Sequence, residues 1–106
     1  MGNPGRKKGV PANAVHPGEM LREEFLVPLG IKPAHLAKSL GIPVPRINDL
    51  VRERRAMTAD TALRLSRYFG NSAQFWMNLQ SEYDLDIAVA KGKGIQKIKP
   101  REERVA

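Results

Sequence analysis

Cysteine is absent from this chain of 106 residues, and histidine occurs only twice. Without thiols there is no disulfide framework, no thiolate metal site and no thiol nucleophile. The longest apolar runs span only a few residues, and no apolar stretch follows the basic N-terminus as it would in a secretory signal. These absences favour a cytoplasmic protein with one compact core, which is what a chain of this length can build.

Signs of catalysis are also lacking. His16 precedes a proline at an expected helix start, where turn structure accounts for it, and His35 is expected on an exposed helix face. The sequence shows no glycine-rich phosphate loop, no metal-ligand spacing and no pair of carboxylates in an apolar setting. We therefore expect no enzyme, no cofactor, no metal site, no small-molecule substrate and no membrane association.

The charge that is present is positive and unevenly distributed. The net charge of +7 resides in the two ends, with three cations in residues 1–15 and a net four in residues 91–106. Between them, residues 46–67 hold six arginines against three carboxylates, whereas residues 68–90 hold three carboxylates and no cation. One half of the core therefore suits a polyanion and the other does not, while the basic ends are equally well explained by solubility.

Composition and periodicity divide the chain into three parts. Residues 1–15 and 91–106 lack apolar periodicity and are expected to be flexible basic arms, although Ile95 and Ile98 would order if a partner covered them. Between the arms the spacing predicts five helices: one from His16-Pro17-Gly18 to about Val27, then about residues 33–40, 44–52, 59–69 and 72–90. No stretch alternates as a strand would, so an all-α domain over residues 16–90 is expected.

Residues at the expected helix ends support these boundaries. Pro17 suits a helix start, and Pro28 is expected to stop the same helix. Thr58 is the expected N-cap of the fourth helix, while Gly41 and Gly70 are the expected stops of the second and fourth.

Residues 33–52 follow the pattern of a helix-turn-helix. An eight-residue helix is followed by the turn Gly41-Ile42-Pro43 and a second helix of similar length. The glycine supplies the positive φ that the turn needs, and the small Ala37 stands where the two helices cross closely. Two short helices around a glycine also occur in bundles that bind no DNA. The apolar positions that would pack across the turn are Leu36, Ala37, Leu40, Ile42, Ile47 and Leu50.

The outer side of the second helix carries side chains suited to base edges. Arg46 can bond a guanine edge in bidentate fashion, Asn48 can bond an adenine edge, and Asp49 can accept from a cytosine amine. Val44 and Pro45 suit a thymine methyl, and they lie at the N-terminal end that usually reaches the bases. An exposed Asp49 is equally consistent with an ordinary solvated face.

Phosphate contacts are expected next to these residues. Arg52, Arg54 and Arg55 follow the second helix, where phosphates would run, and their role would be positional and salt-dependent. Lys38 and Ser39 on the preceding helix are further candidates for the DNA backbone.

Motifs on both sides of this segment resemble those of the HigA antitoxin family. They are His16-Pro17-Gly18-Glu19-Met20-Leu21 at the start, Leu36-Ala37 with Gly41-Ile42 inside the segment, and Phe75-Trp76-Met77-Asn78-Leu79-Gln80 with Tyr83-Asp84-Leu85 near the close. The opening and closing motifs are far more specific than the helix-turn-helix itself. The resemblance covers about residues 15–90 and implies a five-helix, lambda-repressor-like fold of the Cro/C1-type (VapI or Xre-like) group.

The resemblance also implies a function. Such an antitoxin binds its palindromic operator as a homodimer, represses its own operon and neutralises a RelE-like toxin that cleaves mRNA on the ribosome. A dimer is what palindrome recognition requires, because one helix-turn-helix reads about half of the site. The family implies that the last helix builds the dimer interface, although Phe75 and Leu79 are expected mainly in the core. The interface candidates are Trp76, Leu79, Tyr83, Leu85 and Ile87.

Two departures from the family pattern bear on the groove contacts. The family often has Ser or Thr as N-cap of both helices, where this chain has Lys32 and Pro43, so proline preorganisation is expected to replace the cap. The loop after the second helix often holds a glycine, where this chain has Arg52-Glu53-Arg54-Arg55.

Other functions also fit this sequence. One is a solitary repressor of the same fold without a toxin, and another is a protein-interaction module that has lost DNA binding. RNA is a weaker match, because the chain lacks an aromatic stacking sheet. If a basic toxin exists, the acidic Glu82, Asp84 and Asp86 stretch matches it better than the basic tails do.

Overall fold

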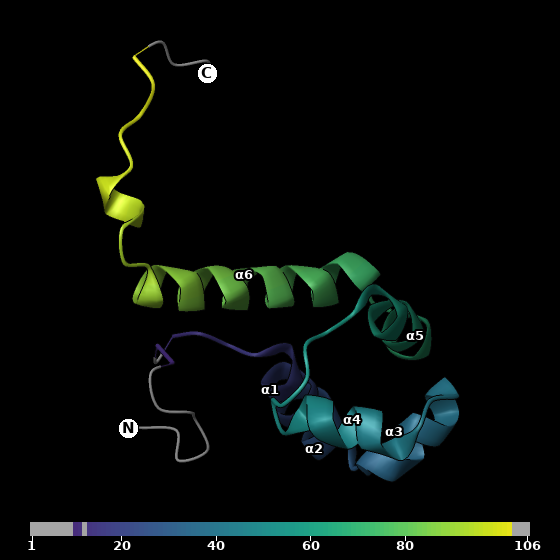
Figure 1. Cartoon of the computed structure of the whole chain (residues 1–106). Helices are drawn as coiled ribbons and strands as arrows, with labels where there is room; N and C mark the ends of the chain where they lie inside the picture. The colour runs from purple at the N-terminus through teal and green to yellow at the C-terminus, as the bar shows by residue number, and fades with distance from the viewer. Residues whose placement is uncertain (1–9, 12, 103–106) are drawn as a thin grey trace.

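The computed structural model describes residues 10–11 and 13–102, which form an all-helical fold (Figure 1). The segments α1 (Pro17–Leu21), η1 (Arg22–Leu26, a π-helix) and α2 (Val27–Leu29) run on as one helix. The helices α3 (Pro33–Leu40), α4 (Val44–Val51), α5 (Ala59–Phe69) and α6 (Ala73–Lys91) follow, with a short 3₁₀ turn η2 (Ile95–Lys97) beyond them. The described residues hold no strand, which confirms the predicted fold class.

The first helix is longer than predicted, because Pro28 does not stop it. The π-helical turn lies just ahead of the proline, and there the Val27 N–H donates to the Arg22 carbonyl five residues back. This wider turn gives the proline ring room beside the carbonyl four residues earlier. The helix ends instead at Gly30, whose φ of 65° is left-handed.

The remaining helix ends confirm the local predictions. Thr58 and Ser72 each accept a hydrogen bond from the backbone N–H three residues later, and Gly41 ends α3 at a φ of 72°. The N-cap residues of α3 and α4 are Lys32 and Pro43, and neither makes a side-chain cap. Each of these two helices has a proline in its first turn, as the sequence indicated.

The start of α1 is fixed closely against α4. His16 is the N-cap, and its Nδ1 accepts the Gly18 N–H at 2.9 Å. The His16 ring meets the Tyr83 ring edge-on, with 4.9 Å between centroids. A Cβ on Gly18 would lie 1.7 Å from the carbonyl oxygen of Leu50, so only glycine fits at this crossing. The opening motif is therefore a packing requirement that holds α4 in place.

The core lies between the first helix, the helix-turn-helix and α6. A cluster of aromatic rings packs at one side of this core. The centroid of the Phe25 ring lies 4.8 Å from that of Phe69 and 5.0 Å from that of Trp76. The Trp76 indole N–H donates to Asn71 at 3.0 Å, so its polar atom is satisfied. The wholly buried large side chains include Leu21, Leu36, Ile47, Leu50, Leu65 and Trp76.

The helix-turn-helix and α6 occupy opposite sides of the molecule. Figure 1 shows α3 and α4 on one side and α6 on the other, with α1 and α5 between them. Beyond α6 the chain runs away from the helical core. Most of the predicted N-terminal arm (residues 1–9 and 12) and residues 103–106 lie outside the described residues. The division into a domain and two flexible arms therefore remains a prediction.

Candidate nucleic-acid interface

The helix α4 presents one face to solvent at the position expected of a recognition helix. It buries Ile47, Leu50 and Val51 against the core, so the opposite face is open. Val44 and Pro45 in its first turn are exposed. The two polar candidates Asn48 and Asp49 are half-buried along the same helix. The side chains predicted to reach base edges are therefore accessible.

Arg46 makes a contact that sequence reasoning missed. Its Nη1 donates to Oδ2 of Asp60 at 3.3 Å, and Nε of Arg64 donates to the same oxygen at 3.0 Å. Arg64 also donates from Nη1 to the carbonyl of Leu40 at 2.9 Å. This network of three side chains ties the first turn of α4 to α5 and to the last turn of α3.

The turn after α4 is held by a second network. Glu53 has a φ of 63°, so it adopts the left-handed conformation that the family's glycine would supply. Arg22 donates to the Glu53 carboxylate at 3.2 Å and also to the Val51 carbonyl. Partial burial lowers the pKa of Arg22, but hydrogen bonds and charges of Glu23 and Glu53 raise it above its ordinary value overall. The charged guanidinium thus fixes the direction in which the chain leaves α4.

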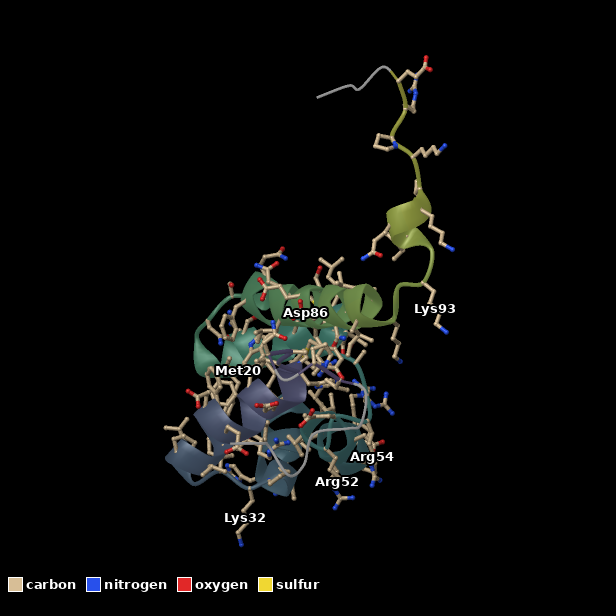
Figure 2. The ribbon with its side chains drawn as sticks, turned by 90° about the vertical axis from the view of Figure 1, so that its left-hand side faces the viewer. Met20, Lys32, Arg52, Arg54, Asp86 and Lys93 are labelled. Atoms are coloured by element: carbon tan, nitrogen blue, oxygen red, sulfur yellow. The ribbon has the colours of Figure 1, made fainter. Side chains whose placement is uncertain are left out.

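The cations predicted for phosphate contact are accessible, and their contact with DNA stays a prediction. Arg52, Arg54 and Arg55 are exposed just beyond the end of α4. Figure 2 shows Arg52 and Arg54 on the side of the molecule away from α6. The Arg55 guanidinium also lies 4.0 Å from the Asp49 carboxylate, so the two side chains form an ion pair in the free protein.

Exposed polar side chains lie at both ends of α3. Lys38 and Ser39 are both exposed in the last turn of the helix. Ser39 lines a surface hollow together with Asp60 and Arg64, so it lies beside the Arg46 network. At the other end of α3, the N-cap residue Lys32 is an exposed cation that was not predicted to contact DNA, and it lies away from α6 (Figure 2).

Comparison with known proteins places this geometry in a family. The family described as Helix-turn-helix (HTH_3) matches residues 21–76. The chain is 51% identical to Virulence-associated protein I of Dichelobacter nodosus, over 94% of this chain and 91% of that protein. It resembles the solved Pseudomonas aeruginosa antitoxin HigA with higBA promoter, at 54% identity and a TM-score of 0.78, over 83% of this chain and 98% of that one. The chain belongs to the HigA-type antitoxin family of helix-turn-helix proteins.

A second solved structure supports the assignment to the HigA-type family. It is PA4674 of Pseudomonas aeruginosa in complex with its operator DNA, at 53% identity and a TM-score of 0.80. The match covers 86% of this chain and 98% of that one. The resemblance stated from the opening and closing motifs is thereby confirmed.

The interface candidates on α6 of this HigA-type chain are unequally accessible. Trp76 is 0% exposed in the single chain, so the prediction that its side chain meets a partner is wrong. Leu79, Tyr83 and Ile87 are half-buried. Leu85 is 62% exposed, and the sequence missed Val89, which is 77% exposed one turn later. The apolar surface of the helix therefore lies towards its C-terminal half.

The described part of the HigA-type chain was predicted to lack metal ligands, catalytic histidines and membrane spans. No group of three or more His, Asp and Glu there is placed to hold a metal ion. His16 acts as the N-cap of α1, and His35 is exposed. No helix among these residues is long and apolar enough to span a membrane.

Proposed function

We propose that this chain is a DNA-binding antitoxin that represses its own operon as a homodimer and neutralises a RelE-like, mRNA-cleaving toxin. The observation that carries the DNA part is the exposed first turn of α4, with Arg52 and Arg54 just beyond the helix. Two similar structures from Pseudomonas aeruginosa were solved with promoter or operator DNA, which supports the same role for this chain.

The proposed division of labour follows from the chemistry of the exposed groups. Val44, Pro45, Arg46 and Asn48 contact base edges in the major groove. Arg52 and the cations that follow it bind phosphates and set the register on the duplex. The test is a gel shift that compares a promoter fragment from upstream of this chain's own operon (the upstream fragment) with a scrambled duplex of the same length. Equal affinity for the two would contradict sequence-specific binding.

The proposed homodimer uses α6. Leu85 and Val89 are four residues apart, so they share one face of the helix, and both are largely exposed. The helix α6 lies on the opposite side of the molecule from α4, so a partner bound to α6 leaves both recognition helices free (Figure 1). Leu79, Tyr83 and Ile87 are half-buried on the same helix, and they remain the other candidates for the contact.

The toxin contact is proposed for the acidic stretch of α6. Glu82 and Asp84 are exposed and Asp86 is half-buried, and no cation lies between residues 68 and 90. A small basic toxin matches this charge. Co-expression with the product of the adjacent gene tests the pairing. The variant Glu82→Lys with Asp86→Lys should weaken it, and an unchanged toxin affinity would exclude this surface.

A solitary repressor is the second candidate function. It is favoured by relatives that carry only the name HTH-type transcriptional regulator. The two candidate functions predict different neighbouring genes, because an antitoxin should have a neighbouring gene for a small, basic, RelE-like protein. Absence of such a gene would favour the solitary repressor and would leave the DNA-binding proposal intact.

A further inference from the structure

One carboxylate links the recognition helix to the rest of the domain. Oδ2 of Asp60 accepts from Arg46 at 3.3 Å and from Arg64 at 3.0 Å. Arg64 is itself anchored by its 2.9 Å bond to the carbonyl of Leu40 at the end of α3. The series of bonds therefore runs from α3 through α5 and ends on the arginine that is proposed to read DNA.

This network leaves a reading edge of Arg46 unoccupied. Asp60 takes only the Nη1 group, and Nε and Nη2 of Arg46 make no hydrogen bond with any residue that the structure describes. These two groups form a planar fork of donors, which matches the paired N7 and O6 acceptors of guanine. The Arg46 side chain is 34% exposed, so a duplex can reach this edge.

The network is too exposed to serve mainly as a stabilising element. The side chains of Asp60 and Arg64 are 58% and 43% exposed, and ion pairs at such positions contribute little to folding. The main effect of these ion pairs is to restrict the motion of the Arg46 side chain. A guanidinium that is already held in one place loses less entropy when it meets a base, and it is less available to a phosphate elsewhere.

We infer that Asp60 is a specificity-determining positioning residue, which holds Arg46 so that it bonds a guanine edge in preference to a phosphate oxygen. The inference rests on the proposed DNA-binding function. Without the Asp60 carboxylate, Arg46 can pair with the phosphates of any sequence. Non-specific binding then gains an ionic contact, while the specific contact loses its fixed geometry.

The variant Asp60→Asn tests this inference, because it keeps the size of the side chain and removes its charge. Its dissociation constants are measured on the upstream fragment and on a scrambled duplex of equal length. The specificity ratio, which is the dissociation constant on the scrambled duplex divided by that on the upstream fragment, should fall by about tenfold. This fall is within the range that one bidentate base contact supplies. On the scrambled duplex, the slope of log K against log salt should steepen by about one.

Two controls separate this effect from a general change in charge. Glu24→Gln, at an exposed position of η1, changes the net charge equally, and it should leave the ratio unchanged. In an Arg46→Ala background, Asp60→Asn should no longer alter the ratio, because its effect passes through Arg46. Circular dichroism and thermal melting verify that every variant is folded.

The possible failures are distinguishable. An unchanged ratio for Asp60→Asn, or an equal fall with and without Arg46, would overturn the inference while the DNA-binding function stands. A wild-type chain that binds both duplexes equally would instead contradict the proposed function itself.

Discussion

Two glycines of the first helix show how differently single residues constrain the fold. At Gly18 the constraint is space, since a Cβ would lie 1.7 Å from the carbonyl oxygen of Leu50 in α4. At Gly30 a Cβ would meet nothing within 4 Å, but the φ of 65° disfavours any residue with a side chain. The first glycine therefore sets how closely α1 approaches the recognition helix, and the second only ends a helix.

Substituting these glycines should give unequal losses of stability. Gly18→Ala should lower the free energy of unfolding by roughly 3 kcal/mol or more, because α1 must move away from α4. Gly30→Ala should cost about 1 kcal/mol, the penalty of the left-handed conformation. Urea denaturation of both variants measures the difference. A loss at Gly18 no larger than that at Gly30 would mean that α1 and α4 do not approach as closely as described.

At the scale of elements, Gln80 attaches α6 to the loop between α4 and α5. Its Oε1 accepts the backbone N–H of Met57 at 2.7 Å, and its Nε2 donates to Asp84 at 2.9 Å. Gln80 and Met57 are both buried. The loop that begins with the phosphate-binding candidates is thus tied at its far end to the helix on the other side of the domain.

Removing this tie should destabilise the domain selectively. Gln80→Leu leaves the Met57 N–H buried without a partner, which should cost about 1–3 kcal/mol of unfolding free energy. The matched control is Gln74→Leu, because Gln74 lies exposed on the same helix and bonds only Asn78. That control should stay within about 0.5 kcal/mol of wild type. Equal denaturation midpoints for the two variants would argue against the Gln80 tie.

The sequence predicts elements whose determinants are local. Thr58 as N-cap and Gly41 as helix stop act within a few residues of their own position, so spacing and residue type were sufficient. Pro28 was misjudged because its effect depends on the π-turn before it, which residue type does not reveal. Trp76 was misjudged because helical periodicity does not separate a core aromatic from an interface one.

The candidate site was predictable only in outline. The order of side chains along α4 follows from the helix-turn-helix pattern, so their exposure could be anticipated. The residues that hold them could not, because Asp60 bonds Arg46 across 14 residues and Arg22 bonds Val51 across 29. Contacts between elements depend on tertiary packing. The periodicity of a single sequence indicates helices but does not indicate which distant residues meet.

At the scale of the whole molecule, the two proposed activities lie on opposite faces. Figure 2 shows Lys32, Arg52 and Arg54 away from α6, whereas Asp86 lies on α6 itself. This separation matches the charge pattern of the sequence, in which residues 46–67 are net positive and residues 68–90 are net negative. DNA and a protein partner can therefore bind without competing for the same surface.

The dimer is tested by placing a charge on the apolar face of α6. Leu85→Glu should yield a monomer of 11.8 kDa, because a carboxylate would be buried in the subunit contact. Leu63 on α5 is 61% exposed against 62% for Leu85, so Leu63→Glu is a matched control that should remain dimeric. Light scattering coupled to size exclusion gives the masses. A dimeric Leu85→Glu, or a monomeric Leu63→Glu, would place the interface elsewhere.

DNA reading by α4 is tested most directly by titrating Arg46→Ala and Arg54→Ala against the upstream fragment and the scrambled duplex. Arg46→Ala should lose about 1–3 kcal/mol of binding free energy on the upstream fragment and much less on the scrambled one. Arg54→Ala should weaken both complexes alike and reduce the salt slope by about one. Specific binding that survives unchanged in both Arg46→Ala and Asn48→Ala would contradict the assignment of α4 as the reading helix.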